Sequence, residues 1–396
     1  MRVLTVLDSY PPDLNGGAYF THHLAKSLVK TGIEVLVVCP SLSLKQGYDT
    51  LEGVPLYRVR SWPIGLYQKF RVCWPIGIKK GIYQAIETFQ PDVIHLQGKF
   101  FLGNICHQFG LERNIPMVAT NHFMPDNFFH YSFLPKRFEK WFHDLCWKKI
   151  LRMFEQVDQV TTPTETAARL LHRVGFKKPV EAISCGVNPA RFKPNQNTDT
   201  LKQQLNIPDS SFYFLVTGRL DKEKNVDFII KTFAKVNQTN PCHLIITGHG
   251  TEKNSLQRLV HQLNINKAVT FTGKIPAEKY PLIYNLSHCL INACEAELQS
   301  IVGLEALSSG LPLLVVNRMA LPELVDEHQN GYLFEPGSQS QLYDLMMSMM
   351  ACPVTLQKMS DHSLAKAKPH HEQHITKAYD SIYKSLTVKN HEYAQK

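Results

Sequence analysis

Residues 290–313 read Leu-Ile-Asn-Ala-Cys-Glu-Ala-Glu-Leu-Gln-Ser-Ile-Val-Gly-Leu-Glu-Ala-Leu-Ser-Ser-Gly-Leu-Pro-Leu. The apolar run 289–293 predicts a β-strand, and the polar residues after it predict a turn. A run of helical composition follows and ends at Gly310, a residue type that commonly closes a helix. The apolar run 311–316 predicts a second strand. This order of elements is typical of an α/β fold with a parallel sheet.

Two glutamates lie near the start of this helix. Glu297 falls in the turn and Glu305, eight positions later, falls in the helix. On one continuous helix they would share a face about 12 Å apart, whereas with Glu297 in the turn they would reach opposite ends of one short ligand. Backbone N–H groups near Ser300 to Val302 would then point at an anion that lies between the two carboxylates. The alternative is that both glutamates are solvated surface acids, and two glutamates at this spacing would by themselves favour it. The surrounding order of strand, turn and helix instead favours a site for a nucleotide-diphospho-sugar.

The stretch resembles the Glu-x7-Glu signature of the retaining GT-B glycosyltransferases, which include sucrose synthases, glycolipid glucosyltransferases and phosphatidylinositol mannosyltransferases. Its turn, Glu297-Leu298-Gln299, is similar to the Glu-Thr-Gln turn of the diacylglycerol glucosyltransferase branch, although Ser300 stands where many members have Gly. The resemblance implies that Glu305 binds the ribose and that Glu297 orients the transferred hexose. It also implies donor contacts from three neighbours: Gln299, Ser300 and Ile301.

Two cations follow the next strand-like run, 212–217, in the sequence Gly-Arg-Leu-Asp-Lys-Glu-Lys-Asn. The guanidinium of Arg219 can form two parallel hydrogen bonds to a diphosphate, and Lys224 offers it a point charge. The alternative is that this is simply a basic, solvated loop. The loop resembles the phosphate-binding loop of the same family, with Asn225, a candidate helix cap, where a Gly is common. The turn 248–250 matches the family's Gly-x-Gly, with Thr251 in place of its usual Pro. The sequence contains no Asp-x-Asp motif of the kind that binds a metal with nucleotide sugars. The two cations would replace a metal ion by stabilising the departing diphosphate, so we expect no obligatory metal and no cofactor.

The first half of the chain begins with a β-α-β unit over residues 2–39. It lacks Gly-x-Gly-x-x-Gly, which disfavours a nicotinamide enzyme. Gly16 and Gly17, at the loop-to-helix junction, would let backbone N–H groups approach an anion closely, and a plain tight turn is the alternative. In the family that this chain resembles, the glycine pair lies between the donor diphosphate and the acceptor.

A loop beginning at Asn121-His122 follows the strand-like run 116–120, at the sheet edge where ligands collect in open α/β folds. A histidine in a loop is usually a polar surface residue. The resemblance implies that His122 reaches the donor sugar and the reaction centre, so we assign it a supporting catalytic role. His95 and His130 are weaker candidates.

The chain has 396 residues, enough for two domains. The resemblance implies an α/β GT-B fold of two doubly wound Rossmann-like domains facing a central cleft. We expect an acceptor-binding domain over residues 1–194, a nucleotide-sugar-binding domain over 195–375, and a helix, 376–396, that returns to the first domain. Nine scattered cysteines without a Cys-x-x-Cys pair favour reduced thiols over disulfides or a zinc site.

The net charge of +9 is compatible with nucleic acid, anionic membranes and phosphorylated substrates. Basic and aromatic residues concentrate in segments 58–80 and 133–153, and no nucleic-acid-binding module is recognisable. The second segment is typical of an interfacial membrane helix or, equally, of a domain helix with an aromatic core stripe. No apolar run reaches roughly 18 residues, so we expect a cytoplasmic protein that binds the inner face of the membrane peripherally.

These features predict a retaining hexosyltransferase that moves glucose from UDP-glucose to a membrane lipid such as diacylglycerol. The donor rests on the Glu-x-Gln turn alone, and GDP-mannose or UDP-GlcNAc are alternatives. A further alternative is a hexosyl- or mannosyltransferase of polysaccharide or lipopolysaccharide synthesis. A non-catalytic GT-B subunit and a UDP-sugar epimerase are disfavoured, because both cations and both glutamates are present.

Overall fold

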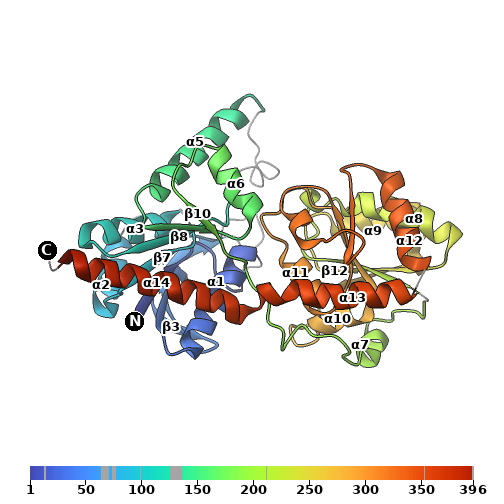
Figure 1. Ribbon diagram of the computed structural model, residues 1–396, viewed down its shortest axis with the longest axis horizontal. Helices are drawn as coiled ribbons and strands as arrows, with labels where there is room; N and C mark the ends of the chain where they lie inside the picture. Colours follow the sequence, from blue (N-terminus) through green and yellow to red (C-terminus); the bar gives the residue numbers. More distant parts are fainter. Residues whose placement is uncertain are drawn as a thin grey trace. The chain divides into compact units, whose positions relative to one another are not determined.

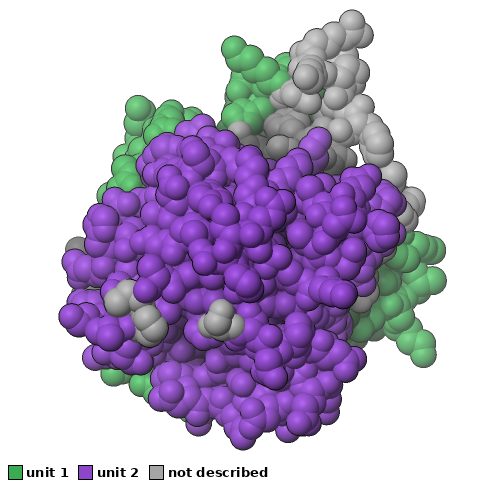
Figure 2. Space-filling model, turned by 90° about the vertical axis from the view of Figure 1, so that its right-hand side faces the viewer, with its two compact units in different colours: residues 1–185, 372–396 green, residues 186–371 purple. Residues whose placement is uncertain are grey.

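The computed structural model describes residues 1–12, 15–63, 71–73, 77–98, 100–124, 136–210, 212–351 and 353–394. The chain forms two compact units, which are coloured separately in Figure 2: unit 1 is Met1–Cys185 with Glu372–Lys396, and unit 2 is Gly186–His371. The expected boundaries at 194 and 376 therefore lie a few residues late. Phe192 is the physical reason for the first difference, because its ring is buried in the core of unit 2 and its carbonyl accepts a hydrogen bond from Ser308 Oγ at 2.7 Å.

Unit 1 contains an eight-stranded sheet in the order β10-β9-β8-β7-β1-β2-β4-β3 within the described residues. Figure 1 labels its strands β3, β7, β8 and β10. All neighbours pair in parallel except β3 and β4. The strands are β1 Arg2–Val6, β2 Glu34–Pro40, β3 Gly47–Leu51, β4 Val54–Val59, β7 Val93–Leu96, β8 Met117–Thr120, β9 Gln159–Thr162 and β10 Val180–Ala182, with β5 Ser61–Pro63 and β6 Arg71–Cys73 in a separate antiparallel pair. The helices are α1 Gly16–Lys30, α2 Lys79–Phe89, α3 Phe101–Arg113, α5 Lys136–Phe154, α6 Glu165–Arg173 and α14 Glu372–Ala394.

The central strands of unit 1 are apolar on both faces because helices cover both faces. Val3 belongs to the core beneath α1 and α14, whereas the adjacent Leu4 belongs to the core beneath α2, α3 and α5. Such alternation is the period-two geometry of a strand. The C-terminal helix α14 therefore forms part of the unit-1 core, with Tyr379 and Tyr383 fully buried against the sheet.

Helix α5 was expected to carry either a membrane-binding or a core aromatic stripe. Trp147 and Ile150 are buried in the unit-1 core, while Trp141 keeps 63% of its surface exposed. Of the stripe expected on this helix, Ile150 is thus a core residue and Trp141 is not, whereas the buried Trp147 was not expected to be part of it. Segments 64–70, 74–76 and 125–135, which include His130, lie outside the described residues.

Unit 2 contains a six-stranded, fully parallel sheet in the order β13-β12-β11-β14-β15-β16 within the described residues. The order reverses between β11 and β14, and ligands bind at the carboxyl ends of strands at such a switch point. The strands are β11 Tyr213–Thr217, β12 His243–Thr247, β13 Val269–Gly273, β14 Cys289–Asn292, β15 Leu313–Val316 and β16 Gly331–Phe334. The helices are α7 Asp199–Gln204, α8 Val226–Thr239, α9 Lys253–Gln262, α10 Tyr280–Leu286, α11 Ile301–Ser308, α12 Gln339–Ala351 and α13 Pro353–Ala367, with 3-10 turns η1 Lys222–Lys224, η2 Asn266–Ala268, η3 Leu321–Leu324 and η4 Lys368–His370.

Among the described residues, no helix combines the length and the apolar character that crossing a bilayer requires.

Candidate active site

The turn between β14 and α11 places the two glutamates as expected from the pattern, Glu297 before the helix and Glu305 within it. Ser300 caps α11, because its buried hydroxyl accepts the Gly303 N–H at 3.2 Å and the Asn292 side-chain amide at 3.1 Å. Replacing the family's usual Gly with Ser thus adds a side chain that fixes the turn. In the first turn of α11, which begins at Ile301, the backbone N–H groups have no helical carbonyl four residues earlier to donate to. They point out of the N-terminal end of the helix.

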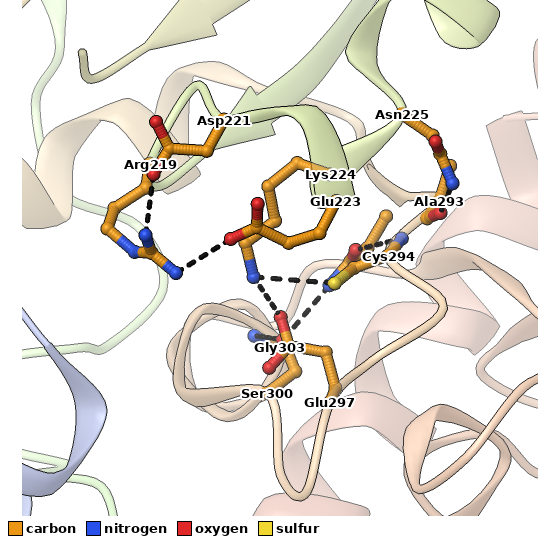
Figure 3. A network of polar contacts seen from close by, with 11 residues as sticks. Arg219, Asp221, Glu223, Lys224, Asn225, Ala293, Cys294, Glu297, Ser300 and Gly303 are labelled. Carbon is orange, nitrogen blue, oxygen red and sulfur yellow. Dashed lines mark hydrogen bonds and ion pairs between the residues drawn. The ribbon is translucent and has the colours of Figure 1, made fainter. Parts of the chain in front are cut away.

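Arg219 lies on the loop after β11 and is held by two carboxylates (Figure 3). Its Nη1 lies 2.5 Å from Asp221 Oδ2, and its Nη2 lies 2.7 Å from Glu223 Oε1. Both carboxylate side chains are only 4% exposed, whereas that of Arg219 is 38% exposed. The buried acids therefore fix the guanidinium while leaving part of it accessible to an anion.

Lys224 lies on the same loop as Arg219 and joins this loop to the turn after β14. Its Nζ lies 2.6 Å from Glu297 Oε1 and 3.5 Å from Cys294 Sγ (Figure 3). Burial lowers the pKa of Lys224, but the charge and the hydrogen bond of Glu297 oppose it and the net shift is upward, so the lysine stays charged. Burial raises the pKa of Cys294 to about 12, so this thiol stays neutral. The structure thus brings Arg219, Lys224 and Glu297 together, because β11 and β14 are neighbouring strands.

Asn225 forms a second link between the two loops. Its side-chain amide donates to Ala293 O at 3.0 Å and to Glu295 Oε1 at 3.2 Å. Asn225 occupies the N-cap position of α8, as expected, but its side chain forms no cap hydrogen bond there. The residue has a φ of 49°, in the left-handed region, which explains why a Gly is common at this position.

The turn 248–250 approaches the Arg219 loop so closely that its glycines have a steric role. A Cβ at Gly248 would lie 1.9 Å from Gly218 O, and one at Gly250 would lie 2.4 Å from Leu220 O. Thr251, in place of the family's usual Pro, donates its N–H at 2.9 Å and its hydroxyl at 3.1 Å to Asp221 Oδ1. Asp221 therefore ties this turn to the loop that carries the arginine.

Glu305 is 4% exposed and is held by a chain of hydroxyl groups. The hydroxyl of Tyr284 donates to Glu305 Oε2 at 2.6 Å, and it lies 3.2 Å from the hydroxyl of Tyr280, which reaches Thr217 at the end of β11 at 2.8 Å. Burial, and then the adjacent Glu305, raise the pKa of Tyr284 well above its ordinary value. Tyr284 therefore remains a hydrogen-bond donor to this carboxylate.

In unit 1, the predicted residues Gly16, Gly17 and His122 lie close together. Asn15 caps α1 by accepting the Ala18 N–H at 2.8 Å, so the helix begins at Gly16. A Cβ at Gly17 would lie 3.5 Å from His122 Cβ. Burial lowers the pKa of His122 to about 4, so its ring is neutral at physiological pH. The seven other predicted site residues belong to unit 2: Arg219, Lys224, Glu297, Gln299, Ser300, Ile301 and Glu305.

His95, the weaker candidate, is fully buried between the sheet and α14, and burial lowers its pKa to about 3. Sequence reasoning missed several residues that contact the predicted ones. The acids interspersed with the cations of residues 219–224 could have signalled their pairing, but the tyrosine, the glutamine and the cysteine carry no such signal. The missed residues are Gln97, Asp221, Glu223, Tyr284 and Cys294. Within the described part of the chain, no three His, Cys, Asp or Glu side chains gather as metal ligands would.

Two family models match successive parts of the chain. Residues 14–191 match the family described as Glycosyltransferase Family 4, and residues 197–366 match Glycosyl transferases group 1. An alpha-monoglucosyldiacylglycerol synthase of Streptococcus pneumoniae is 26% identical over 92% of this chain and 81% of its own length. A GDP-mannose-dependent alpha-mannosyltransferase of Mycobacterium tuberculosis is 25% identical over 85% of this chain and 84% of its own length. The crystal structure of Anabaena Alr3699/HepE in complex with UDP-glucose has the same fold, with a TM-score of 0.77 and 17% identity over 98% of this chain and all of that one.

Proposed function

Because this chain belongs to the family 4-like GT-B glycosyltransferases, we propose that it transfers glucose from UDP-glucose to a membrane lipid such as diacylglycerol, with retention of anomeric configuration. One observation carries the proposal: the Lys224–Glu297 ion pair, at 2.6 Å, joins a two-cation loop to a turn that precedes a helix start. This arrangement provides cations for a diphosphate and a carboxylate for a sugar at adjacent positions. The glucosyldiacylglycerol synthase among the relatives supports the choice of acceptor and sugar.

The residues of unit 2 account for donor binding and departure. Arg219 and Lys224 stabilise the negative charge that develops on the leaving nucleoside diphosphate, and electrostatic stabilisation of this kind usually contributes more to catalysis than any other effect. Glu305, held by Tyr284, accepts hydrogen bonds from the ribose hydroxyls, and Glu297 orients the hexose. Gln299 and the N–H groups at the start of α11, near Ser300 and Ile301, complete the donor site.

The transfer itself needs a proton acceptor. As the bond from the anomeric carbon to the phosphate oxygen breaks, the acceptor oxygen forms its bond on the same face of the sugar, and the departing phosphate oxygen takes the acceptor's proton. Gly16, Gly17 and His122 of unit 1 are proposed to serve this step. His122, whose pKa is about 4, binds a hydroxyl group but is too weak a base to keep a proton at neutral pH.

The proposal includes no obligatory metal or cofactor, because the two cations supply the positive charge. Transfer is therefore expected to continue in a buffer that contains a chelator of divalent cations. Activity that disappears with the chelator and returns with Mg²⁺ or Mn²⁺ would contradict this part of the proposal.

Peripheral binding to the inner face of an anionic membrane is also proposed. The net charge of +9 and the exposed Trp141 on the lysine-containing helix α5 support it. The protein should sediment with vesicles that contain anionic lipid at low salt and remain in solution with neutral vesicles. Equal sedimentation with both would exclude an electrostatic contribution.

A panel of donors tests the function directly. UDP-glucose, GDP-mannose and UDP-GlcNAc are each incubated with the protein, with and without vesicles containing dioleoylglycerol, and the free nucleoside diphosphate is measured. We expect UDP release only with UDP-glucose and the lipid, accompanied by a glucolipid product. Release only from GDP-mannose, as the mannosyltransferase relative would suggest, would contradict UDP-glucose as the donor. No release from any donor would favour a binding subunit.

A further inference from the structure

A buried polar network lies beneath His122 in unit 1, and the reaction scheme above does not use it. His122 Nε2 lies 2.7 Å from the side-chain oxygen of Gln97, which is 1% exposed. An amide oxygen can only accept a hydrogen bond, so this contact requires a proton on Nε2. The neutral ring then carries no proton on Nδ1, and within the described residues no group hydrogen-bonds that nitrogen.

The orientation of the Gln97 amide follows from its other neighbour. Its nitrogen lies 3.2 and 3.1 Å from the two ring nitrogens of His95. These nearly equal distances place the amide nitrogen over the face of the ring, and an N–H group is attracted to an aromatic face, whereas a carbonyl oxygen would be repelled. The amide oxygen must therefore face His122.

His95 is fixed in turn by elements far apart in the sequence. Its Nδ1 lies 2.7 Å from the hydroxyl of Tyr383 on α14, and its Nε2 lies 2.7 Å from Thr120 Oγ1 at the end of β8. Thr120 also contacts Thr161 Oγ1 at 2.6 Å and the hydroxyl of Tyr379 at 3.3 Å. Each of these side chains is at most 3% exposed, so the network is shielded from water.

The ring of His122 is also confined by packing. The Phe20 ring of α1 lies 4.9 Å from it, centroid to centroid, and the backbone at Gly17 packs against its Cβ. With one nitrogen hydrogen-bonded and the ring packed against α1, His122 presents the remaining nitrogen in one direction.

We propose that Gln97 is a positioning residue for the transfer reaction: it holds His122 as the Nε2–H tautomer and presents Nδ1 as a hydrogen-bond acceptor for a substrate hydroxyl group, while the His95–Tyr383 pair holds Gln97 in place. The C-terminal helix α14 thereby contributes to the chemistry although its tyrosines touch no substrate. This inference rests on the proposed function for the identity of the hydroxyl group, and on the unit-1 geometry for the rest.

Two substitutions at Gln97 separate positioning from a purely structural role. Gln97→Met keeps the length of the side chain but removes its oxygen, and we expect kcat to fall about tenfold while KM for UDP-glucose changes by less than twofold. Gln97→Glu keeps an acceptor for the Nε2 proton and adds a negative charge beside the ring. That charge should raise the pKa of His122, which means that the ring binds a proton about ten- to a thousandfold more tightly. Activity of this variant should approach that of the unsubstituted protein at pH 8 and fall at mildly acidic pH, where the unsubstituted protein stays active.

A third variant avoids placing a charge in the core. Tyr383→Phe removes one hydroxyl from the network, and kcat should fall roughly two- to fivefold without a change in KM. Tyr10→Phe is the matched control, because Tyr10 is also buried in unit 1 and its hydroxyl also contacts a histidine, His22 Nδ1 at 2.9 Å. Tyr10→Phe should lose about as much thermal stability as Tyr383→Phe but keep the kcat of the unsubstituted protein.

The titration of the His122 ring, followed by NMR without any substrate, keeps the inference separate from the proposed function. A higher ring pKa in Gln97→Glu, together with the kinetic changes, supports the inference even if the sugar or the acceptor differs from the proposed one. An unchanged ring titration in that variant overturns it, as does full kcat in Gln97→Met or equal losses of kcat in Tyr383→Phe and Tyr10→Phe. If Gln97→Glu does not fold, the other two variants decide.

Discussion

Glu297→Gln is the substitution that tests the site most directly, because Glu297 both neutralises Lys224 and is proposed to orient the hexose. The ion pair is 2.6 Å long, and its lysine and glutamate side chains are 22% and 16% exposed. Exposed pairs contribute about 0–1 kcal/mol, and removing one partner of a fully buried pair costs about 3–5 kcal/mol. A mostly buried pair at a site edge lies between these limits, so we expect a loss of about 1–2 kcal/mol of stability and a Tm lower by about 2–6 °C.

The same substitution should affect ligand binding in the opposite direction. Without the carboxylate, Lys224 is left without its charged partner, and a diphosphate no longer competes with Glu297 for it. The loss of about 1–2 kcal/mol in the empty protein should reappear as UDP binding that is about 5- to 30-fold tighter. Transfer should nevertheless slow roughly 10- to 100-fold, since a hydrogen bond from the sugar to a charged acceptor contributes about 1.5–3 kcal/mol.

Calorimetric titration with UDP and steady-state transfer from UDP-glucose measure the two effects separately. Glu295→Gln is the matched control: Glu295 lies two positions away, contacts Asn225 and Arg318, and is 43% exposed, so its loss should change neither quantity by more than about twofold. Near-normal turnover of Glu297→Gln would remove Glu297 from the mechanism. Weaker UDP binding by this variant would refute the competition between the carboxylate and the diphosphate.

Three further predictions concern the surrounding residues. Asp221→Asn loosens the clamp on the site arginine, so KM for UDP-glucose should rise about 3- to 10-fold in initial-rate measurements, and an unchanged KM would show that the clamp is dispensable. Tyr284→Phe should weaken UDP binding about 3- to 10-fold but leave binding of 2′,3′-dideoxy-UDP unchanged in calorimetry, because the tyrosine acts through Glu305 on the ribose; equal losses for both ligands would contradict this. In the folded protein the pKa values of His95 and His122 are about 3 and about 4, below the ordinary value of 6.5. At a pH between the folded and the ordinary values, the unfolded chain therefore binds more protons than the folded chain. Their contribution to stability is complete above pH 6.5 and lost as the pH falls towards 4, and the unfolding midpoint should drop between pH 7 and pH 5; replacing His95 with Gln should reduce that drop.

Much of the fold could be predicted from the sequence because local patterns carry it. The prediction of two Rossmann-like α/β units is confirmed, and the expected strand 289–293 is β14, Cys289–Asn292. The next strand begins at Leu313 rather than at the expected 311. The reason is local, since the Leu311 N–H donates to Ala306 O and closes the helix, and Pro312 has no N–H to donate. Helix α1 begins at Gly16, within the expected loop-to-helix junction, because Asn15 caps it.

The partners of the site residues could not be predicted in the same way, because they depend on strand order. Lys224 and Glu297 are 73 positions apart and meet only because β11 and β14 are neighbours in the sheet. Gln97 and His122, 25 positions apart, meet because β7 pairs with β8. Apolar periodicity reveals a strand but not its neighbours. A glutamine that follows a buried strand therefore carries no sequence signal of its partner.

The charges of unit 2 show why composition alone is a poor guide to this site. The chain carries a net charge of +9, yet the two predicted phosphate-binding cations face three carboxylates, those of Asp221, Glu223 and Glu297. Such a site does not attract anions through a surplus of charge. It holds its cations in fixed positions, and in the proposed reaction a diphosphate competes with carboxylates that are already in place. On that proposal the same carboxylates offset the loss of the anion when it leaves, so a product with two phosphates dissociates without leaving two unpaired cations in a mostly buried loop.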